Sequence, residues 1–321
     1  MDWKKLEYAR EIKKRIDNIT GTRKITKTME MIASSRIIKA KQRIFETRPF
    51  IEKMEEFIKN IAFSTEASYD RLMKPHESEK VVLVMGITSD RGLCGGYNAR
   101  IIKVIGNQVK RINDQEKEVV LYITGTKGKN YFKYRGVKME KVYEHLSDHP
   151  KFFDAREMSR EFISKFVVGE VDKIIVCYTK FISTIEHKPV VQQILPIPVI
   201  ENVGQEEKKM YGVKKMHVDS SAYNTVPVFI FEPSSQELLR GLIPEYIFTM
   251  VYGILLESCV SEIGARMIGM KNASDNAEEM IKDLTIRYHK ARQQQITTEI
   301  IEIISGAEAF RERKGEYLNY D

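Results

Sequence analysis

The sequence predicts an α/β protein in which a long antiparallel two-helix coiled coil, formed by the two ends of the chain, joins a central Rossmann-like α/β domain. Both ends carry apolar residues at steps of three and four, which is typical of one helix face. Strands, turns and helices alternate between them, which is typical of a parallel sheet. We expect the N-terminal helix within residues 1–63, the α/β domain within 78–232 and the C-terminal helix within 233–321.

The N-terminal helix is expected from Lys4 to about Phe63, a stretch whose only proline is Pro49. A helix of about 59 residues would be roughly 88 Å long, more than a compact domain can bury. It therefore needs an equally long apolar partner. The stripe consists of Leu6, Ala9, Ile12, Ile16, Ile19, Ile25, Met29, Ile32, Ile51, Met54, Ile58 and Ile61.

The middle of the chain changes to short apolar runs separated by turns. The last two predicted strands flank residues 183–188 closely enough to form an antiparallel hairpin at the sheet edge, whereas the others are separated by helices and should be parallel. Residues 226–233 could add one more strand. The expected strands are 81–88, 118–124, 139–144, 173–179 and 189–195, and the expected helices lie near 98–112, 127–135 and 154–168.

The C-terminal helix is expected to begin at Ser234 or Ser235, either of which can cap it, and to run to about Arg313. Its apolar stripe shifts by one residue after Arg292–Gln295. An ordinary helical bundle is the alternative, but the helix lengths favour a coiled coil. Small residues would let the two backbones approach closely, namely Gly264, Ala265, Gly269, Ala273 and Ala277.

Composition indicates a protein outside the membrane with an acidic partner. The formal net charge is +7, and residues 1–60 alone contain 16 Lys/Arg against 9 Asp/Glu. The start of the chain lacks a signal-peptide pattern, and no stretch approaches the roughly 20 apolar residues of a membrane span. The three cysteines have no metal or disulfide spacing, so we expect free thiols.

Two glycine-rich turns raise the possibility of a nucleotide-using enzyme. The first, at residues 88–98, has the spacing G-x-x-G-G instead of the G-x-G-x-x-G of dinucleotide sites. The second, at residues 124–131, has Asn130 where a P-loop needs Ser or Thr and Ile123 where it needs glycine. Neither turn therefore predicts nucleotide binding.

Other catalytic or metal-binding patterns are equally weak. His145 and His149 are four residues apart, but Pro150 favours a loop and H-E-x-x-H is missing. Cys94 has no identifiable base, and the G-x-S-x-G motif is also missing. We expect no catalytic residue, no metal site and no cofactor.

Three segments carry a family resemblance. Residues 12–43 ("IKKRIDNITGTRKITKTMEMIASSRIIKAKQR"), 89–98 ("SDRGLCGGYN") and 261–309 ("SEIGARMIGMKNAS…ARQQQITTEIIEIISGAEA") together resemble the gamma subunit of F-type ATP synthase, in the expected order. The resemblance implies a non-catalytic rotor shaft that couples ion flow to ATP synthesis or hydrolysis. It implies contacts with the alpha and beta subunits, the epsilon subunit and the membrane c-ring. Nucleotides would bind the surrounding ring, and a bacterial-type location at the cytoplasmic face of the membrane is expected.

The resemblance also implies partner contacts at specific residues. Arg292 and Gln293 match a catch that hydrogen-bonds a carboxylate-bearing loop of beta, with Thr297 and Met29 beside it. An acidic lever of beta would meet the lower shaft, whose basic stretch runs from Arg23 to Arg48. The residues expected there are Lys24, Lys27, Asp90 and Arg91, of which the last two are also candidates for fixing the glycine turn.

Two rival hypotheses remain at the level of sequence. One is a nucleotide-dependent enzyme, motivated by the glycine turns. The other is a nucleic-acid-binding coiled-coil protein, motivated by the basic N-terminal helix, although no recognition motif accompanies that charge. The shaft hypothesis predicts neither nucleic-acid binding nor direct nucleotide binding.

Overall fold

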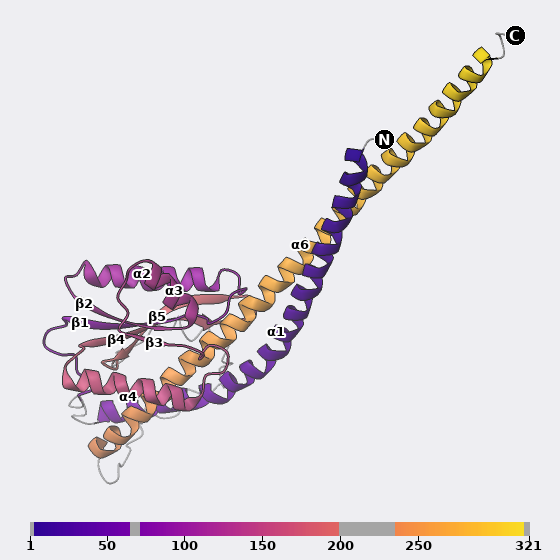
Figure 1. The fold of residues 1–321 in the computed structure, drawn as a ribbon. Helices are drawn as coiled ribbons and strands as arrows, with labels where there is room; N and C mark the ends of the chain where they lie inside the picture. The colour runs from indigo at the N-terminus through magenta and orange to yellow at the C-terminus, as the bar shows by residue number, and fades with distance from the viewer. Residues whose placement is uncertain (1–2, 65–70, 199–234, 318–321) are drawn as a thin grey trace, which may run out of the picture. The chain divides into compact units, whose positions relative to one another are not determined.

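The computed structural model describes residues 3–64, 71–198 and 235–317 (Figure 1). The chain forms two compact units, one made of residues 1–33 and 267–321 and the other of residues 34–266. The two longest helices, α1 (Trp3–Ser64) and α6 (Ser235–Tyr317), each contribute to both units. The strand predicted at residues 226–233 lies outside the described residues.

In the first unit, α1 and α6 pack along part of the predicted apolar stripe, whereas Ile25 and Ile32 of that stripe are 63 % and 49 % exposed. Ala9 and Ile12 of α1 form a buried cluster with Ala291 of α6. Further along α1, Arg23 pairs with Glu278 at 3.1 Å. Later residues of α1 thus contact earlier residues of α6, which confirms that the two helices are antiparallel.

In the second unit, small residues on α6 admit side chains from α1. A Cβ atom added to Gly253 would lie 2.6 Å from Cδ1 of Ile51, and one added to Gly264 would lie 3.4 Å from Cδ1 of Ile37. Glycine at these positions allows the apolar side chain to rest on the α6 backbone. This role was predicted from the sequence for Gly264 but not for Gly253.

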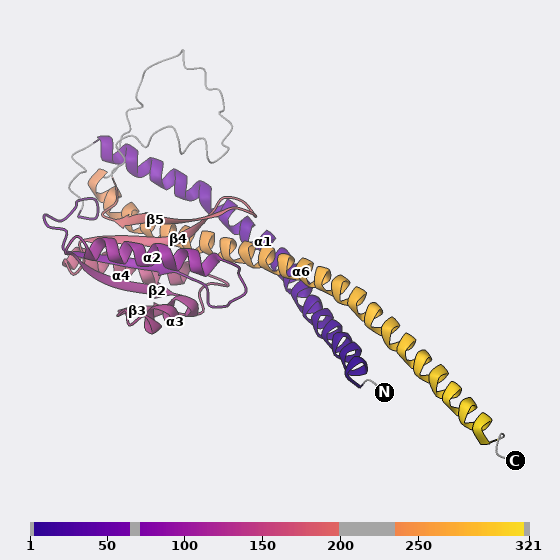
Figure 2. The same cartoon turned by 90° about the horizontal axis from the view of Figure 1, so that it is seen from above.

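The central sheet has five strands in the order β3-β2-β1-β4-β5. Its first four strands in that order are parallel, and β5 pairs antiparallel with β4 at the edge, as predicted (Figure 2). The strands are β1 (Val81–Ile87), β2 (Glu118–Thr124), β3 (Lys141–Tyr143), β4 (Lys173–Phe181) and β5 (His187–Leu195).

Helices cover both faces of this sheet (Figure 1). On one face, α2 (Tyr97–Asn113) and α3 (Thr126–Tyr134) bury alternate residues of β1, β2 and β4, such as Val84 and Ile123. On the other face, α4 (Phe152–Val168), α1 and the beginning of α6 bury the intervening residues, such as Met85 and Tyr122. This two-sided burial explains why the parallel strands are continuous apolar runs.

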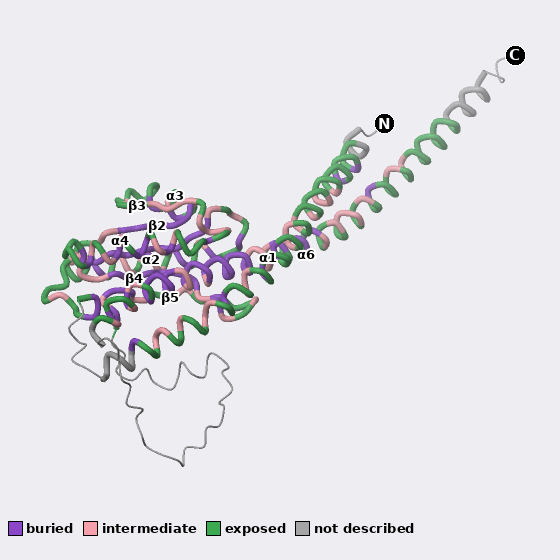
Figure 3. Tube along the Cα trace, turned by 90° about the horizontal axis from the view of Figure 1, so that it is seen from below, coloured by how far each residue is buried: buried purple, intermediate pink, exposed green. Residues whose placement is uncertain are grey.

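Burial along α6 falls towards its C-terminal end (Figure 3). Residues 246–251 are buried or nearly so beside the sheet, whereas residues 299–308 are all exposed. One 18-residue window of this helix is apolar enough to cross a membrane, but 83 % of it is buried within the protein. Its composition is therefore that of a core helix.

Candidate functional site

Asp90 ties together three loops at the carboxyl end of the parallel strands. Its carboxylate accepts hydrogen bonds from the Thr126 backbone N–H at 3.1 Å, the His145 N–H at 3.1 Å and the Ser147 hydroxyl at 2.9 Å. Burial alone would raise the pKa of Asp90, but these hydrogen bonds stabilise its charged form and lower the pKa below 3.8. The geometry therefore supports the expectation that Asp90 fixes the glycine turn.

The second glycine turn packs directly against the first. Gly125 has φ +90°, and a Cβ atom there would lie 2.3 Å from the carbonyl oxygen of Thr88. The Gly128 N–H donates a hydrogen bond to the Thr88 hydroxyl at 2.9 Å. The glycines thus serve close packing of two loops, and the N–H that a phosphate would need at Gly128 already has a partner.

The crevice above the sheet, where open α/β folds bind ligands, is filled by α6. The Tyr97 hydroxyl donates to the Ser258 carbonyl at 3.4 Å, and the Cys259 thiol donates to the Asp148 carbonyl at 3.5 Å. The cavity left between the crevice residues and α6 is about 10 Å³. A space of that size holds at most one water molecule, whereas small-molecule sites need about 300 Å³ or more.

A buried ion pair lies where α6 enters this crevice. Arg266 approaches Glu262 to 2.6 Å, and the Glu262 side chain is only 1 % exposed. Arg266 also donates to the Gly92 carbonyl of the first glycine turn at 3.3 Å. Burial raises the pKa of Glu262, and the charge of Arg266 opposes that rise.

Arg91 and Cys94 occupy different environments within the same turn. The Arg91 side chain is 68 % exposed and pairs with Asp148 at 3.3 Å, so its guanidinium lies at the surface. Asp148 also lies 3.9 Å from Arg36 of α1. Cys94 is buried with Tyr97 and Ala265. All three cysteines are free thiols, as predicted, and all three are buried.

The three residues predicted for the catch on α6 are exposed. Gln293 and Thr297 line one shallow groove together with Lys290, Gln294 and Thr298. Arg292 is exposed on the same turn and has no ion-pair partner among the residues that the structure describes. Met29 is half-buried on α1, so it belongs to the packed side of the helix pair.

The lysines predicted for the lower shaft are also exposed. Lys24 faces solvent, and Lys27 pairs with Glu30 of the same helix at 3.0 Å with 58 % of its side chain exposed. Such a pair is worth little in water and can exchange for a partner's carboxylate. Both lysines are therefore accessible to an acidic surface.

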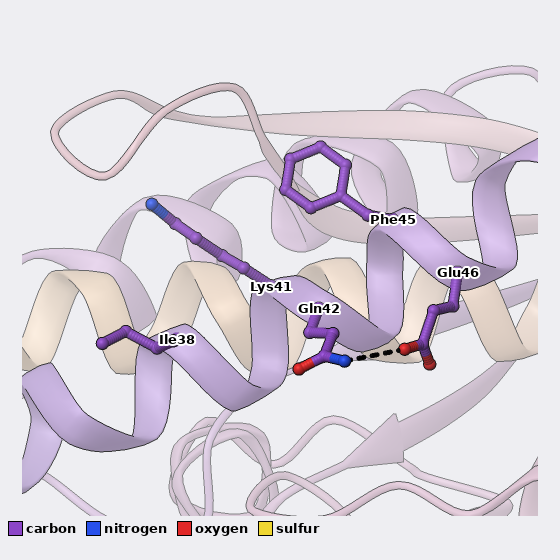
Figure 4. Close-up of a pocket in the computed structure, with 5 residues that line it drawn as sticks. All are labelled: Ile38, Lys41, Gln42, Phe45 and Glu46. Atoms are coloured by element: carbon purple, nitrogen blue, oxygen red, sulfur yellow. Dashed lines mark hydrogen bonds between the residues drawn. The ribbon is translucent and has the colours of Figure 1, made fainter.

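Two exposed apolar surfaces add to these predicted residues. On α1, Ile38 and Phe45 are 67 % and 63 % exposed and flank a shallow groove that also contains Lys41, Gln42 and Glu46 (Figure 4). This groove was not predicted from the sequence, although the seven-residue spacing of Ile38 and Phe45 outside the main stripe is a signal for a second helix face. Between residues 296 and 308 of α6 the exposed isoleucines are Ile296, Ile300, Ile301, Ile303 and Ile304, with exposed fractions between 45 % and 71 %.

Known proteins match this chain over nearly its whole length. The sequence model of a family described as ATP synthase matches residues 8–310. The ATP synthase gamma chain of Alkaliphilus metalliredigens is 39 % identical over 303 residues, which cover 94 % of this chain and 98 % of the relative. The chain belongs to the ATP synthase gamma chain family. The gamma chain of Halothermothrix orenii is 37 % identical over 307 residues, covering 95 % and 100 % of the two chains.

Solved structures share the fold of this gamma chain family member at low sequence identity. A chain from the mitochondrial ATP synthase of Euglena gracilis in rotational state 3 matches with a TM-score of 0.60 at 17 % identity, covering 96 % of each chain. A chain from the central stalk and c-ring of the Tetrahymena thermophila enzyme matches with a TM-score of 0.53 at 22 % identity, covering 78 % of this chain and 99 % of that one. The family assignment makes the chain a non-catalytic subunit, the central rotor stalk of an F-type ATP synthase.

Proposed function

We propose that this gamma chain turns inside a ring of alternating alpha and beta subunits and couples ion flow to their catalytic sites. The exposed apolar surface of α6 supports this proposal most directly. Five isoleucines are exposed between residues 296 and 304 of α6, and all residues from 299 to 308 face solvent. An unpartnered apolar helix face of this kind indicates burial by other subunits, and a ring of subunits would surround it on every side.

The anchoring of α6 supports torque transmission. Both α6 and α1 contribute to both compact units, so rotation of the α/β domain must pass through these two helices. In the sheet crevice α6 is held by the hydrogen bond from Arg266 to the Gly92 carbonyl and by the one from Tyr97 to the Ser258 carbonyl. Several fixed contacts to different loops resist slippage better than a single apolar surface.

We infer two contact regions with the beta subunits. The first is the catch, in which Arg292 and Gln293 bind a carboxylate-bearing loop with Thr297 and Met29 beside them. Arg292 is exposed and can donate two parallel hydrogen bonds to a carboxylate.

The second region is the lower shaft, where Lys24, Lys27 and Arg91 would face an acidic lever. Their exposure supports this assignment. Asp90 fits it less well, because its carboxylate is already hydrogen-bonded to two other loops. We assign Asp90 the task of holding Arg91 in position.

The remaining assignments extend the proposal to the rest of the complex. The α/β domain would join the epsilon subunit and the membrane c-ring at the cytoplasmic face of the membrane, as in a bacterial enzyme. The segments 1–63, 78–232 and 233–321 would act as first shaft helix, α/β domain and second shaft helix. Because α6 fills the sheet crevice, we expect this chain to bind no nucleotide itself, and we expect no nucleic-acid binding.

Reconstitution tests the proposed function. The purified chain should have no ATPase activity alone, and it should raise the ATPase activity of alpha and beta subunits when it enters a complex with them. Arg292→Ala should lower that activity by about tenfold, which corresponds to the loss of one charge-assisted contact. Lys282→Ala is the matched control, because Lys282 is also exposed on α6 but pairs with Glu278 of the same helix. A chain that fails to enter the complex would refute the proposal, and equal activity of the Arg292 and Lys282 variants would remove Arg292 from the catch.

A further inference from the structure

His187 is a buried histidine at the first position of β5. It is 7 % exposed and stands opposite Phe181 in the β4–β5 hairpin. The two rings are stacked, with their centroids 6.0 Å apart and an angle of 26° between their planes. The histidine is therefore fixed on one side by its own hairpin.

The other side of the His187 ring rests on the backbone of α6. A Cβ atom added to Gly264 would lie 2.9 Å from Cε1 and 3.2 Å from Nε2 of His187. A side chain at position 264 would have to displace the ring. The contact between the hairpin and α6 thus depends on the His187 ring packing against a glycine at position 264.

Neither ring nitrogen of His187 has a hydrogen-bond partner among the described residues, although both are buried. Burying a neutral imidazole without a hydrogen-bond partner is unfavourable because the ring loses hydrogen bonds to water. Burying a charged imidazolium in the same way costs much more free energy. The buried ring is therefore tolerated only while it is neutral.

The charged groups near His187 also disfavour a positive charge on it. Lys41 of α1 lies 5.3 Å above the Phe181 ring, and Arg100 of α2 acts on the histidine through space. Lys180 of β4 and Lys188 of β5 face each other one position along the hairpin. On α6, Glu257 accepts a hydrogen bond from the Phe181 backbone and interacts with the charge of Lys180, and Arg48 lies 3.2 Å from its carboxylate.

We propose that His187 is an acid-sensitive latch, which holds the β4–β5 hairpin on α6 while its ring is neutral and releases the hairpin when the ring is protonated. Burial, together with the charge of Arg100, lowers the pKa of His187 below 6.5. A lowered histidine pKa means that the open state binds the proton more tightly than the closed state. The latch therefore keeps its full strength above about pH 6.5 and loses it as the pH falls towards the lowered value.

Release would loosen one of the elements that hold α6 against the sheet. In terms of the proposed rotor function, on which this consequence rests, acidification would reduce the stiffness of the connection between the α/β domain and the shaft. The latch itself concerns only the hairpin and α6 within one chain. Its test can therefore succeed or fail independently of the rotor proposal.

Hydrogen exchange of the isolated full-length chain tests the latch. Exchange of hairpin amides near residues 181–188 and of α6 near residue 264 would be measured at about pH 7.5 and about pH 5, after correction for the intrinsic rate. We expect their protection to fall at the lower pH, by up to about tenfold for each pH unit by which the pKa is lowered. The His187→Phe variant keeps a ring that cannot be protonated. In this variant the hairpin amides should lose no more protection at the lower pH than amides in the rest of the sheet.

His149→Gln is the matched control, because His149 is exposed in a loop and should leave the wild-type pH response intact. A second measurement does not depend on how well the His187→Phe variant folds. Among the resonances of the six imidazoles in carbon-13-labelled histidine, the one that is missing in His187→Phe should titrate in the wild-type chain with a midpoint below about 6.5. A His187 midpoint at or above about 6.5, or equal pH responses of wild type and His187→Phe, would overturn the proposal.

Discussion

The carboxylate of Glu262 and the guanidinium of Arg266 lie 2.6 Å apart in the sheet crevice, with 1 % and 12 % of their side chains exposed. Both residues belong to α6, but Arg266 also reaches the first glycine turn through the Gly92 carbonyl. The pair therefore links the shaft helix to the loops at the carboxyl end of the sheet.

Removing one partner of this buried pair should be costly. Arg266→Met leaves the Glu262 carboxylate buried without its counter-ion, and we expect the free energy of unfolding to fall by about 3–5 kcal/mol. The double variant Glu262→Leu/Arg266→Met removes both charges and should recover much of that loss. Urea unfolding of the three chains measures both effects. A double variant less stable than Arg266→Met would show that the apolar replacement does not fit the crevice.

Asp90 should make the loops at the carboxyl end of the sheet sensitive to acid. Because its pKa is lowered in the folded state, Asp90 stabilises the fold above about pH 3.8, and this contribution is lost as the pH falls through the lowered value. Asp90→Asn should lower stability by about 2–3 kcal/mol at neutral pH and flatten this part of the pH dependence. Asp114→Asn, at an exposed position after α2, is the control and should resemble the wild type in thermal unfolding followed across this pH range.

Two glycines with positive φ should respond differently to the same substitution. Gly125→Ala places a Cβ atom 2.3 Å from the Thr88 carbonyl, whereas Gly136→Ala, at φ +69°, has no atom within 4 Å of the new carbon. We expect a loss of about 1–2 kcal/mol for Gly136→Ala from backbone strain alone. For Gly125→Ala we expect about 3 kcal/mol or more, because the steric clash is added. Equal losses in denaturant melts would mean that the two loops separate easily.

The three thiols should resist alkylation in the folded chain. Burial raises the pKa of both Cys177 and Cys259 to about 12, and it also raises the pKa of Cys94. The thiolate is the reactive form, so iodoacetamide at neutral pH should modify none of them before the chain unfolds. Mass spectrometry should then show three additions in denaturant. Rapid labelling of the native protein would indicate that α6 leaves the crevice frequently.

The sequence predicted most of the secondary structure because strands and helices here follow clear apolar patterns. The strand at 118–124 agrees with its predicted bounds, and both terminal helices agree to within a few residues. The strand expected at 139–144 is only Lys141–Tyr143, because three residues pair with β2. Strand β5 begins earlier than expected, at His187, since the hairpin pairing with β4 continues beyond Pro189.

The site was less predictable because it depends on contacts between distant parts of the chain. The sequence suggested Asp90 as a residue that could fix the turn, but it could not reveal the His145 and Ser147 partners. The Glu262–Arg266 pair had a local signal in its four-residue spacing, yet only the fold shows that it is buried. His187 had no signal, since its contact with Gly264 joins a hairpin to a helix far away in the sequence.

Direct observation of rotation tests the central claim, that this chain is the turning shaft of the complex. Tyr134 is 88 % exposed on α3, so Tyr134→Cys offers one accessible thiol for a probe while the native cysteines remain buried. The labelled chain would be assembled with surface-fixed alpha and beta subunits, and the probe would be followed in a microscope after addition of ATP. We predict stepwise rotation in one direction that stops when ATP is removed. A complex that hydrolyses ATP while the probe keeps a fixed orientation would contradict the account.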